Sequence, residues 1–261
     1  MRRFILIALL LTSALPAQAD PAKAAPNNNI TILADEDMML PLAQLARAYS
    51  LKTKTPLTIV MKSTEEVQAQ IEQGLEAHVI ITANYPLIQQ LTDQGLTDVS
   101  SRRTIARTQL ALVTVGDLNK EANIAKRISF ASMLYATEGI PVYVDDPSTV
   151  EGARAAKLLT NHDFSDVLAA RTQTRPTHDE LMASLRDGAA LGIILAATTV
   201  TEPDVRVLSL LADDLSPPVM FDSIVLGSEA MSDAKRFNDY LSTDKARAIF
   251  AHFGYQAPAV K

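Results

Sequence analysis

Short runs of apolar residues alternate along the chain with segments in which apolar residues recur every three or four positions. The runs are rich in branched side chains and are bounded by turn residues, which is typical of buried β-strands. We predict strands over Ile30–Leu33, Leu57–Met61, His78–Ala83, Gln109–Val115, Val142–Val144, Leu191–Ala196, Val205–Leu210 and Val219–Leu226.

The segments between these runs place their apolar residues on one helical face, as Leu42, Leu45 and Tyr49 do in the first of them. Glycine follows several of these segments, at Gly74 and Gly254 for example, which is a common helix stop. Strands that alternate with helices predict an α/β fold with helices on both faces of the sheet, and the chain length fits two small lobes. The later helices are predicted over Ser148–Leu159, Phe164–Arg171, Thr177–Asp187, Ser232–Leu241 and Thr243–His252.

The first residues have the order of a secretory signal peptide. Arg2 and Arg3 precede the apolar run Phe4–Leu15, and the small residues of Ala17–Ala19 offer a cleavage site. The run is shorter than the roughly 20 residues that span a bilayer. We therefore predict a signal peptide over 1–19, a disordered leader over 20–28 and export to the periplasm; an uncleaved interfacial anchor is the alternative.

Composition removes several classes of function. The chain has 261 residues, a net charge of −6 and no cysteine. An acidic chain without a basic run is a poor ligand for nucleic acid or anionic membranes. The absence of cysteine excludes a thiol nucleophile, a thiolate metal site and a lipidated cysteine. The four histidines are scattered and the sequence has no G-x-S-x-G, H-E-x-x-H or glycine-rich dinucleotide turn, so we predict no enzyme and no cofactor.

Three loops carry a hydroxyl residue followed three positions later by glutamate. This spacing is the capping box, which satisfies unpaired N–H groups at the start of a helix. The same N–H groups can instead converge on an anionic ligand. Spacing alone leaves both interpretations open for Ser63 with Glu66, Ser148 with Glu151, and Thr177 with Glu180.

Five segments follow one another in a distinctive order and spacing: Ile30–Tyr49, Val67–Ala83, Asp146–Leu159, Leu215–Leu226 and Ser242–Gln256. Together they resemble the periplasmic molybdate-binding proteins, which have the type II solute-binding fold of ABC importers. The resemblance implies two lobes, each a mostly parallel sheet flanked by helices, that close on a ligand by a hinge motion. Lobe 1 would comprise 29–107, lobe 2 would comprise 108–221, and 222–261 would return to complete lobe 1. The resemblance also implies a monomeric receptor that delivers a small molecule or ion to an ABC permease in the inner membrane.

The resemblance also points to ligand-binding positions. The family binds an oxyanion through hydroxyl groups and through N–H groups at helix N-termini. Ser63 and Thr64 match hydroxyl positions, whereas Gly152 and His178 match positions that present N–H groups. Asp37 replaces a serine and Leu195 replaces a tyrosine. The candidate ligand-binding residues are Asp37, Ser63, Thr64, Gly152 and His178.

Asp37 changes the expected ligand. A carboxylate 4 Å from an oxyanion repels it by roughly 4 kcal/mol for each unit charge at an effective dielectric near 20. Asp37 therefore either caps the helix that begins near Met39, or marks a ligand that is a metal cation, a chelated metal or a cationic solute. Asp37 and His178 are then candidate metal ligands, the alternative for His178 being an exposed residue at a helix start. A periplasmic sensor or interaction subunit that reuses the fold is a third alternative.

Overall fold

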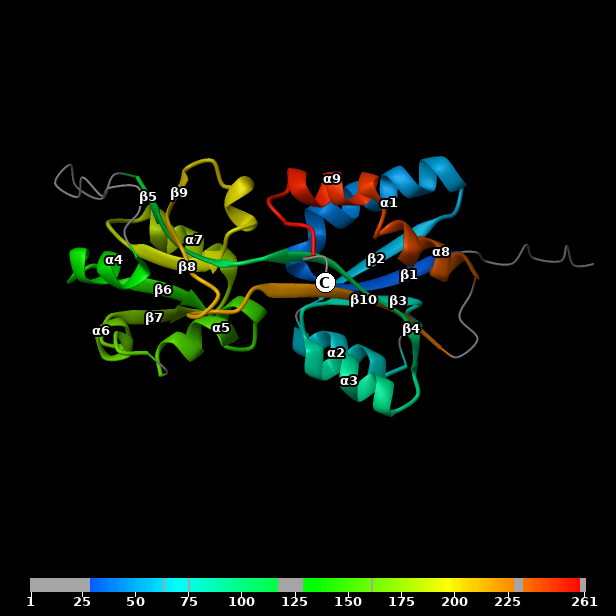
Figure 1. Cartoon of the computed structure of the whole chain (residues 1–261), viewed down its shortest axis with the longest axis horizontal. Helices are drawn as coiled ribbons and strands as arrows, with labels where there is room; N and C mark the ends of the chain where they lie inside the picture. The colour runs from blue at the N-terminus through cyan, green and yellow to red at the C-terminus, as the bar shows by residue number, and fades with distance from the viewer. Residues whose placement is uncertain are drawn as a thin grey trace, which may run out of the picture.

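The computed structural model describes residues 29–62, 64–74, 76–116, 129–160, 162–227 and 232–258. The predicted signal peptide and leader lie outside these residues. Two lobes, each built on a five-stranded sheet, lie side by side along the long axis of the molecule (Figure 1). This arrangement confirms the predicted two-lobed α/β class.

Lobe 1 has the strand order β2-β1-β3-β10-β4. Its strands are β1 (Ile30–Asp35), β2 (Leu57–Lys62), β3 (Val79–Thr82), β4 (Thr97–Thr108) and β10 (Val219–Leu226). Helices α2 (Thr64–Glu72) and α3 (Tyr85–Asp93) cover one face of this sheet. Helices α1 (Met39–Thr53), α8 (Ser232–Tyr240) and α9 (Asp244–His252) cover the other face (Figure 1).

Lobe 2 has the strand order β7-β6-β8-β5-β9. Its strands are β5 (Leu110–Val115), β6 (Val142–Asp145), β7 (Thr172–Arg175), β8 (Leu191–Leu195) and β9 (Val205–Leu210). Helix α7 (His178–Arg186) packs on one face through Leu181, Met182 and Leu185. The other helices of this lobe are α4 (Phe130–Ala136), α5 (Val150–Leu158) and α6 (Ser165–Ala169), and the short 3-10 helix η2 (Thr198–Val200) follows β8.

Both sheets are mixed. In lobe 1, β1 pairs in parallel with β2 and β3, whereas β10 runs antiparallel to β3 and β4. In lobe 2, β6 pairs in parallel with β7 and β8, whereas β5 runs antiparallel to β8 and β9. The antiparallel pairs arise because the chain crosses between the lobes along β4 and β5 and returns along β10. The resemblance had implied mostly parallel sheets, and these crossing strands account for the difference.

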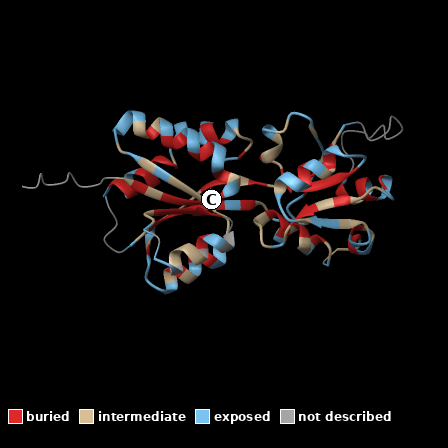
Figure 2. Cartoon of the chain, turned by 180° about the vertical axis from the view of Figure 1, so that it is seen from behind, coloured by how far each residue is buried: buried red, intermediate tan, exposed pale blue. Residues whose placement is uncertain are grey.

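Buried residues follow the sheets through the middle of each lobe (Figure 2). One continuous apolar cluster includes Ile32 and Phe221 in lobe 1 and Leu112 and Ile193 in lobe 2. The predicted lobe limits at 107/108 and 221/222 stay a prediction. Strand β4 ends near the first limit, at Thr108, and β10 begins near the second, at Val219. Among the described residues, no helix combines the length and apolar character needed to cross a membrane.

Candidate functional site

A pocket of about 550 Å³ lies between the two lobes. Lobe 1 contributes the start of α1 and the 3-10 helix η1 (Glu36–Met38), together with Phe253 and Tyr255 after α9. Lobe 2 contributes the start of α7, with Thr177 and His178, and the segment around η2. The pocket thus lies where loops that follow parallel strands meet, which is the usual ligand position in open α/β sheets.

Asp37 faces this pocket from lobe 1. Its backbone carbonyl accepts a hydrogen bond of 2.6 Å from the hydroxyl of Tyr255, which fixes η1 against the C-terminal segment. Helix α1 begins at Met39 without a side-chain cap, so Asp37 does not serve that helix as a cap. Burial raises the pKa of Asp37 to about 6; the positive charge of His178 opposes this rise, and Asp145 and Glu36 add to it.

Asp35 has a structural role beside the pocket. Its buried carboxylate accepts hydrogen bonds from the hydroxyl of Thr82 at 2.9 Å and from the N–H of Ala83 at 2.7 Å. These bonds join the ends of β1 and β3. Burial raises the pKa of Asp35 to about 7, although both hydrogen bonds oppose the rise.

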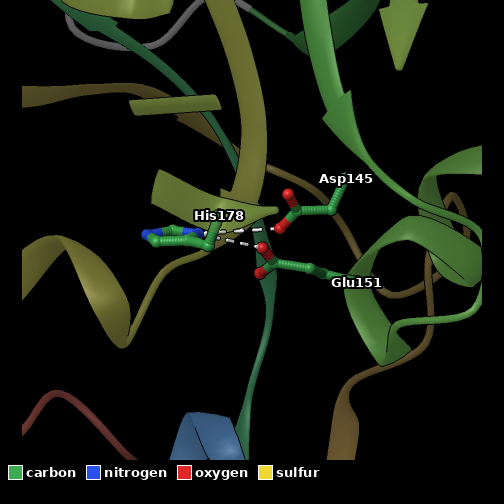
Figure 3. Close-up of side chains that lie close together, drawn as sticks. All are labelled: Asp145, Glu151 and His178. Atoms are coloured by element: carbon green, nitrogen blue, oxygen red, sulfur yellow. Dashed lines mark hydrogen bonds and ion pairs between the residues drawn. The ribbon is translucent and has the colours of Figure 1, made fainter. Parts of the chain in front are cut away.

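Three side chains of lobe 2 meet beside the pocket (Figure 3). Asp145 ends β6, Glu151 lies in the first turn of α5, and His178 is the first residue of α7. The Nδ1 atom of His178 lies 3.3 Å from Oε1 of Glu151 and 3.6 Å from Oδ2 of Asp145. The second oxygen of Glu151 accepts a 2.9 Å hydrogen bond from the N–H of Leu195 at the end of β8. Three separate segments therefore fix the cluster.

The charges within this cluster depend on one another. Burial lowers the pKa of His178, but hydrogen bonds and charges from Asp145 and Glu151 outweigh burial and raise it to about 10. Burial and the adjacent Asp145 raise the pKa of Glu151 well above its ordinary value. Burial also acts to raise the pKa of Asp145, but its bonds to Glu151 and His178 bring it below the ordinary value. The hydrogen bonds and charges thus favour the charged forms of His178 and Asp145, whereas burial favours the protonated form of Glu151.

The predicted site residues fall in different places. Asp37 and His178 line the same pocket from opposite lobes. Ser63 lies outside the described residues. Thr64 is the first residue of α2, but its side chain is not among the described ones. The N–H of Gly152 donates to the hydroxyl of Thr149 at 3.0 Å. The cap of α5 therefore already occupies the N–H group that was expected to bind a ligand. The backbone of Leu195 holds Glu151 in place.

The capping patterns have two different outcomes. The hydroxyl of Thr177 accepts the N–H of Glu180 at 3.2 Å, which is the expected cap. At the start of α5 the cap is Thr149 rather than Ser148, and Glu151 turns inward to His178 and Leu195. The sequence interpretation therefore missed Glu151 and Asp145. Their one sequence signal was the position of Asp145 at the carboxyl end of a predicted strand.

A two-lobed α/β molecule with a pocket between its lobes has the architecture of a solute-binding protein. The chain belongs to the bacterial extracellular solute-binding protein family, which it matches over residues 30–256. This family is non-enzymatic, which confirms the prediction that the chain is not an enzyme, and its members bind solutes and components of ABC transporters.

Known relatives share the whole fold at low identity. The chain is 22% identical to the molybdate-binding protein ModA of Haemophilus influenzae, over 89% of this chain and 92% of that protein. The substrate-binding domain of a putative molybdenum ABC transporter from Clostridium difficile is 21% identical, with a TM-score of 0.75 over 88% of this chain and 99% of that one. Iron-bound HitA from Pseudomonas aeruginosa is 18% identical, with a TM-score of 0.63 over 89% of this chain and 90% of that one. Proteins of this fold therefore carry both oxyanions and metals.

Proposed function

We propose that the chain is the periplasmic receptor of an ABC importer and that it binds a positively charged solute between its lobes. Family membership supports the receptor role, and the predicted signal peptide over 1–19 would export the chain. Residues from both lobes of one chain line the pocket, so a monomer suffices to bind and to deliver the ligand to a permease in the inner membrane.

The lining of the pocket determines the sign of the ligand. Carboxylates of Glu36, Asp37, Asp179 and Glu202 line it, and the described lining residues include neither lysine nor arginine. Arg186 pairs with Glu202, and His178, the one basic side chain of the described lining, is paired with Asp145 and Glu151. Each carboxylate of the lining repels an oxyanion 4 Å away by roughly 4 kcal/mol for each unit charge. A metal cation, a chelated metal or a cationic solute gains the corresponding attraction.

The observation that carries this proposal is the position of Asp37. Asp37 lines the pocket opposite His178, and the resemblance to the molybdate-binding proteins matches this position to a serine. A bare tetrahedral dianion would meet this carboxylate, and His178, the one basic side chain of the described lining, is already paired with Asp145 and Glu151. We therefore favour the cationic ligand over the molybdate-like oxyanion that the resemblance alone would give.

Calorimetry on the purified mature chain tests the proposal. Sodium molybdate, zinc chloride and putrescine dihydrochloride, titrated at one ionic strength, represent an oxyanion, a metal and a cationic solute. We expect saturable one-to-one binding of a cation and no binding of molybdate. The bound cation should stabilise the chain by about 2.7 kcal/mol at a concentration 100-fold above its Kd.

The variant Asp37→Ser isolates the charge. It should weaken cation binding and increase the affinity for molybdate, because the repelling carboxylate is gone. The matched control is Asp93→Ser, which removes one exposed carboxylate from α3 on the opposite face of the lobe 1 sheet. Tight molybdate binding by the unaltered chain, with no gain in Asp37→Ser, would contradict the cationic assignment.

A further inference from the structure

Asp145, Glu151 and His178 have the composition and the spacing of a metal site. They offer two carboxylates and one imidazole, and one ligating atom from each lies within 4.8 Å of the other two. Carboxylate and imidazole together are ligands for zinc and its neighbours among the divalent transition metals. The cluster borders the pocket, because His178 belongs both to the cluster and to the pocket lining.

The distances fit a tetrahedral ion. Zinc lies about 2.0–2.1 Å from nitrogen and oxygen ligands, so two ligands of a tetrahedral site are about 3.3–3.4 Å apart. Nδ1 of His178 is 3.3 Å from Oε1 of Glu151 and 3.6 Å from Oδ2 of Asp145. Both distances from His178 therefore lie within a few tenths of an ångström of the tetrahedral value.

An unsatisfied buried group also points to a ligand here. Asp145 is only 2% exposed, and among the described residues its Oδ1 atom has no hydrogen-bond partner. Buried charged groups are normally hydrogen-bonded, paired or bound to a metal. The carboxylate of Asp145 reaches into the cluster beside His178, as Figure 3 shows. A cation bound by this carboxylate would give its unpartnered oxygen a partner.

The surrounding backbone holds Glu151 in a ligating orientation. Its Oε2 atom accepts the N–H of Leu195, so Oε1 points at His178. Outer hydrogen bonds of this kind orient ligands in metal sites. Three protein ligands leave a fourth position open, as in zinc sites that exchange a ligand.

We propose that Asp145, Glu151 and His178 bind a divalent transition metal of the zinc class as cargo, and that Asp37 of lobe 1 supplies a further oxygen when the lobes close. Asp37 lines the same pocket, and its carboxylate has no hydrogen-bond partner among the described residues. The ion would thus connect the two lobes. This assignment rests on the proposed receptor function and narrows its ligand to a metal.

Zinc chloride alone, added to the purified and EDTA-treated chain, tests the assignment. Calorimetry and elemental analysis should show one zinc per chain. Zinc-edge X-ray absorption should show one imidazole nitrogen and carboxylate oxygens at about 2.0–2.2 Å. Asp37→Asn should weaken binding about tenfold and reduce the zinc-induced decrease in the radius of gyration, because it removes only the ligand from lobe 1.

Two further variants keep the test specific. His178→Gln should lower zinc affinity at least 100-fold, whereas His252→Ala, which removes an exposed imidazole from α9, should leave it unchanged. If His178→Gln does not fold by circular dichroism, Glu151→Gln replaces it, with the same loss expected. Unchanged zinc affinity in the folded variant, or two or more imidazoles in the absorption spectrum, would overturn the metal site. Binding of putrescine but not zinc, lost in Asp37→Ser, would overturn it and leave the receptor function intact.

Discussion

Replacement of Gly152 by alanine should destabilise the chain strongly, because α5 begins directly on the backbone of the loop before it. A Cβ atom at Gly152 would lie 2.0 Å from the carbonyl oxygen of Asp146 and 2.6 Å from that of Asp145. Real Cβ atoms essentially never lie within 3.0 Å of such an atom. Both obstructing atoms belong to the backbone, so a side-chain rotation cannot relieve the clash. The first turn of α5 must therefore move away by roughly 1 Å or more.

The cost follows from what that movement breaks. Overpacking against a backbone costs about 1–3 kcal/mol. Displacement of the Gly152 N–H from the Thr149 hydroxyl removes a cap worth about 1 kcal/mol. Displacement of Glu151 leaves the buried N–H of Leu195 without its acceptor, which costs about 1–3 kcal/mol. We expect the free energy of unfolding to fall by about 4 kcal/mol and Tm by roughly 8–16 °C.

Thermal and urea unfolding, followed by circular dichroism, measure this loss. Gly188→Ala is the matched control, because a Cβ atom there meets no atom within 4 Å and Gly188 is exposed after α7. It should be neutral or stabilising by up to about 1 kcal/mol. If Gly152→Ala melts within about 2 °C of Gly188→Ala, α5 does not rest on the Asp145–Asp146 backbone in solution, and the reasoning fails.

Two further changes probe the surroundings of the pocket. In EDTA, the free energy of unfolding should fall by up to about 4 kcal/mol as pH rises from about 4 to 7. In this range Asp35 keeps its proton in the folded chain, where its pKa is about 7, but has released it in the unfolded chain. Chemical denaturation across this range should show that Asp35→Asn reduces the fall of the unfolding free energy with pH. If the fall is the same in Asp35→Asn, Asp35 is ionised in the folded chain. Gly254→Ala should lower both Tm and cargo affinity, because Gly254 has a φ of +81° and its added Cβ would lie 2.6 Å from Cγ2 of Val200 and 3.0 Å from Cα of Ala197 across the lobes. Unaltered affinity by calorimetry would show that the lobes do not meet there when the ligand binds.

The fold was predictable where strands are buried on both faces. All of Leu191–Leu195 is buried, and so is nearly all of Leu110–Val115, which explains their unbroken apolar runs. Strand β4 was missed because its sequence, TDVSSRRTIART, is mostly polar. Its pairing with β10 rather than its side chains makes it a strand. Strand β7, with the sequence TQTR at a sheet edge, was missed for the same reason.

The site was predictable only in part. Asp37 and His178 were found through the positions that the resemblance assigned, and both line the pocket. Glu151 was interpreted as the partner of Ser148 in a capping box, because it follows Ser148 by three positions. Only the structure shows that Thr149 provides the cap and frees Glu151 to turn inward. Asp145 reaches the cluster through the meeting of β6, α5 and α7, which no local pattern encodes.

The core and the pocket use different residues, so a framework similar to that of the molybdate-binding proteins is compatible with the proposed cationic ligand. The residues that define the sheets, such as Ile32, Leu112 and Ile193, lie in the core and do not contact the pocket. The charge of the pocket instead depends on side chains at strand ends and helix starts, among them Asp37, Asp145 and Glu151. Without cargo, the positive charge that the cluster favours on His178 faces the buried carboxylate of Asp145. A divalent ion would gain the attraction of the cluster's carboxylates, whereas an oxyanion would add two negative charges beside Asp37, where the one basic side chain of the described lining, His178, is already paired.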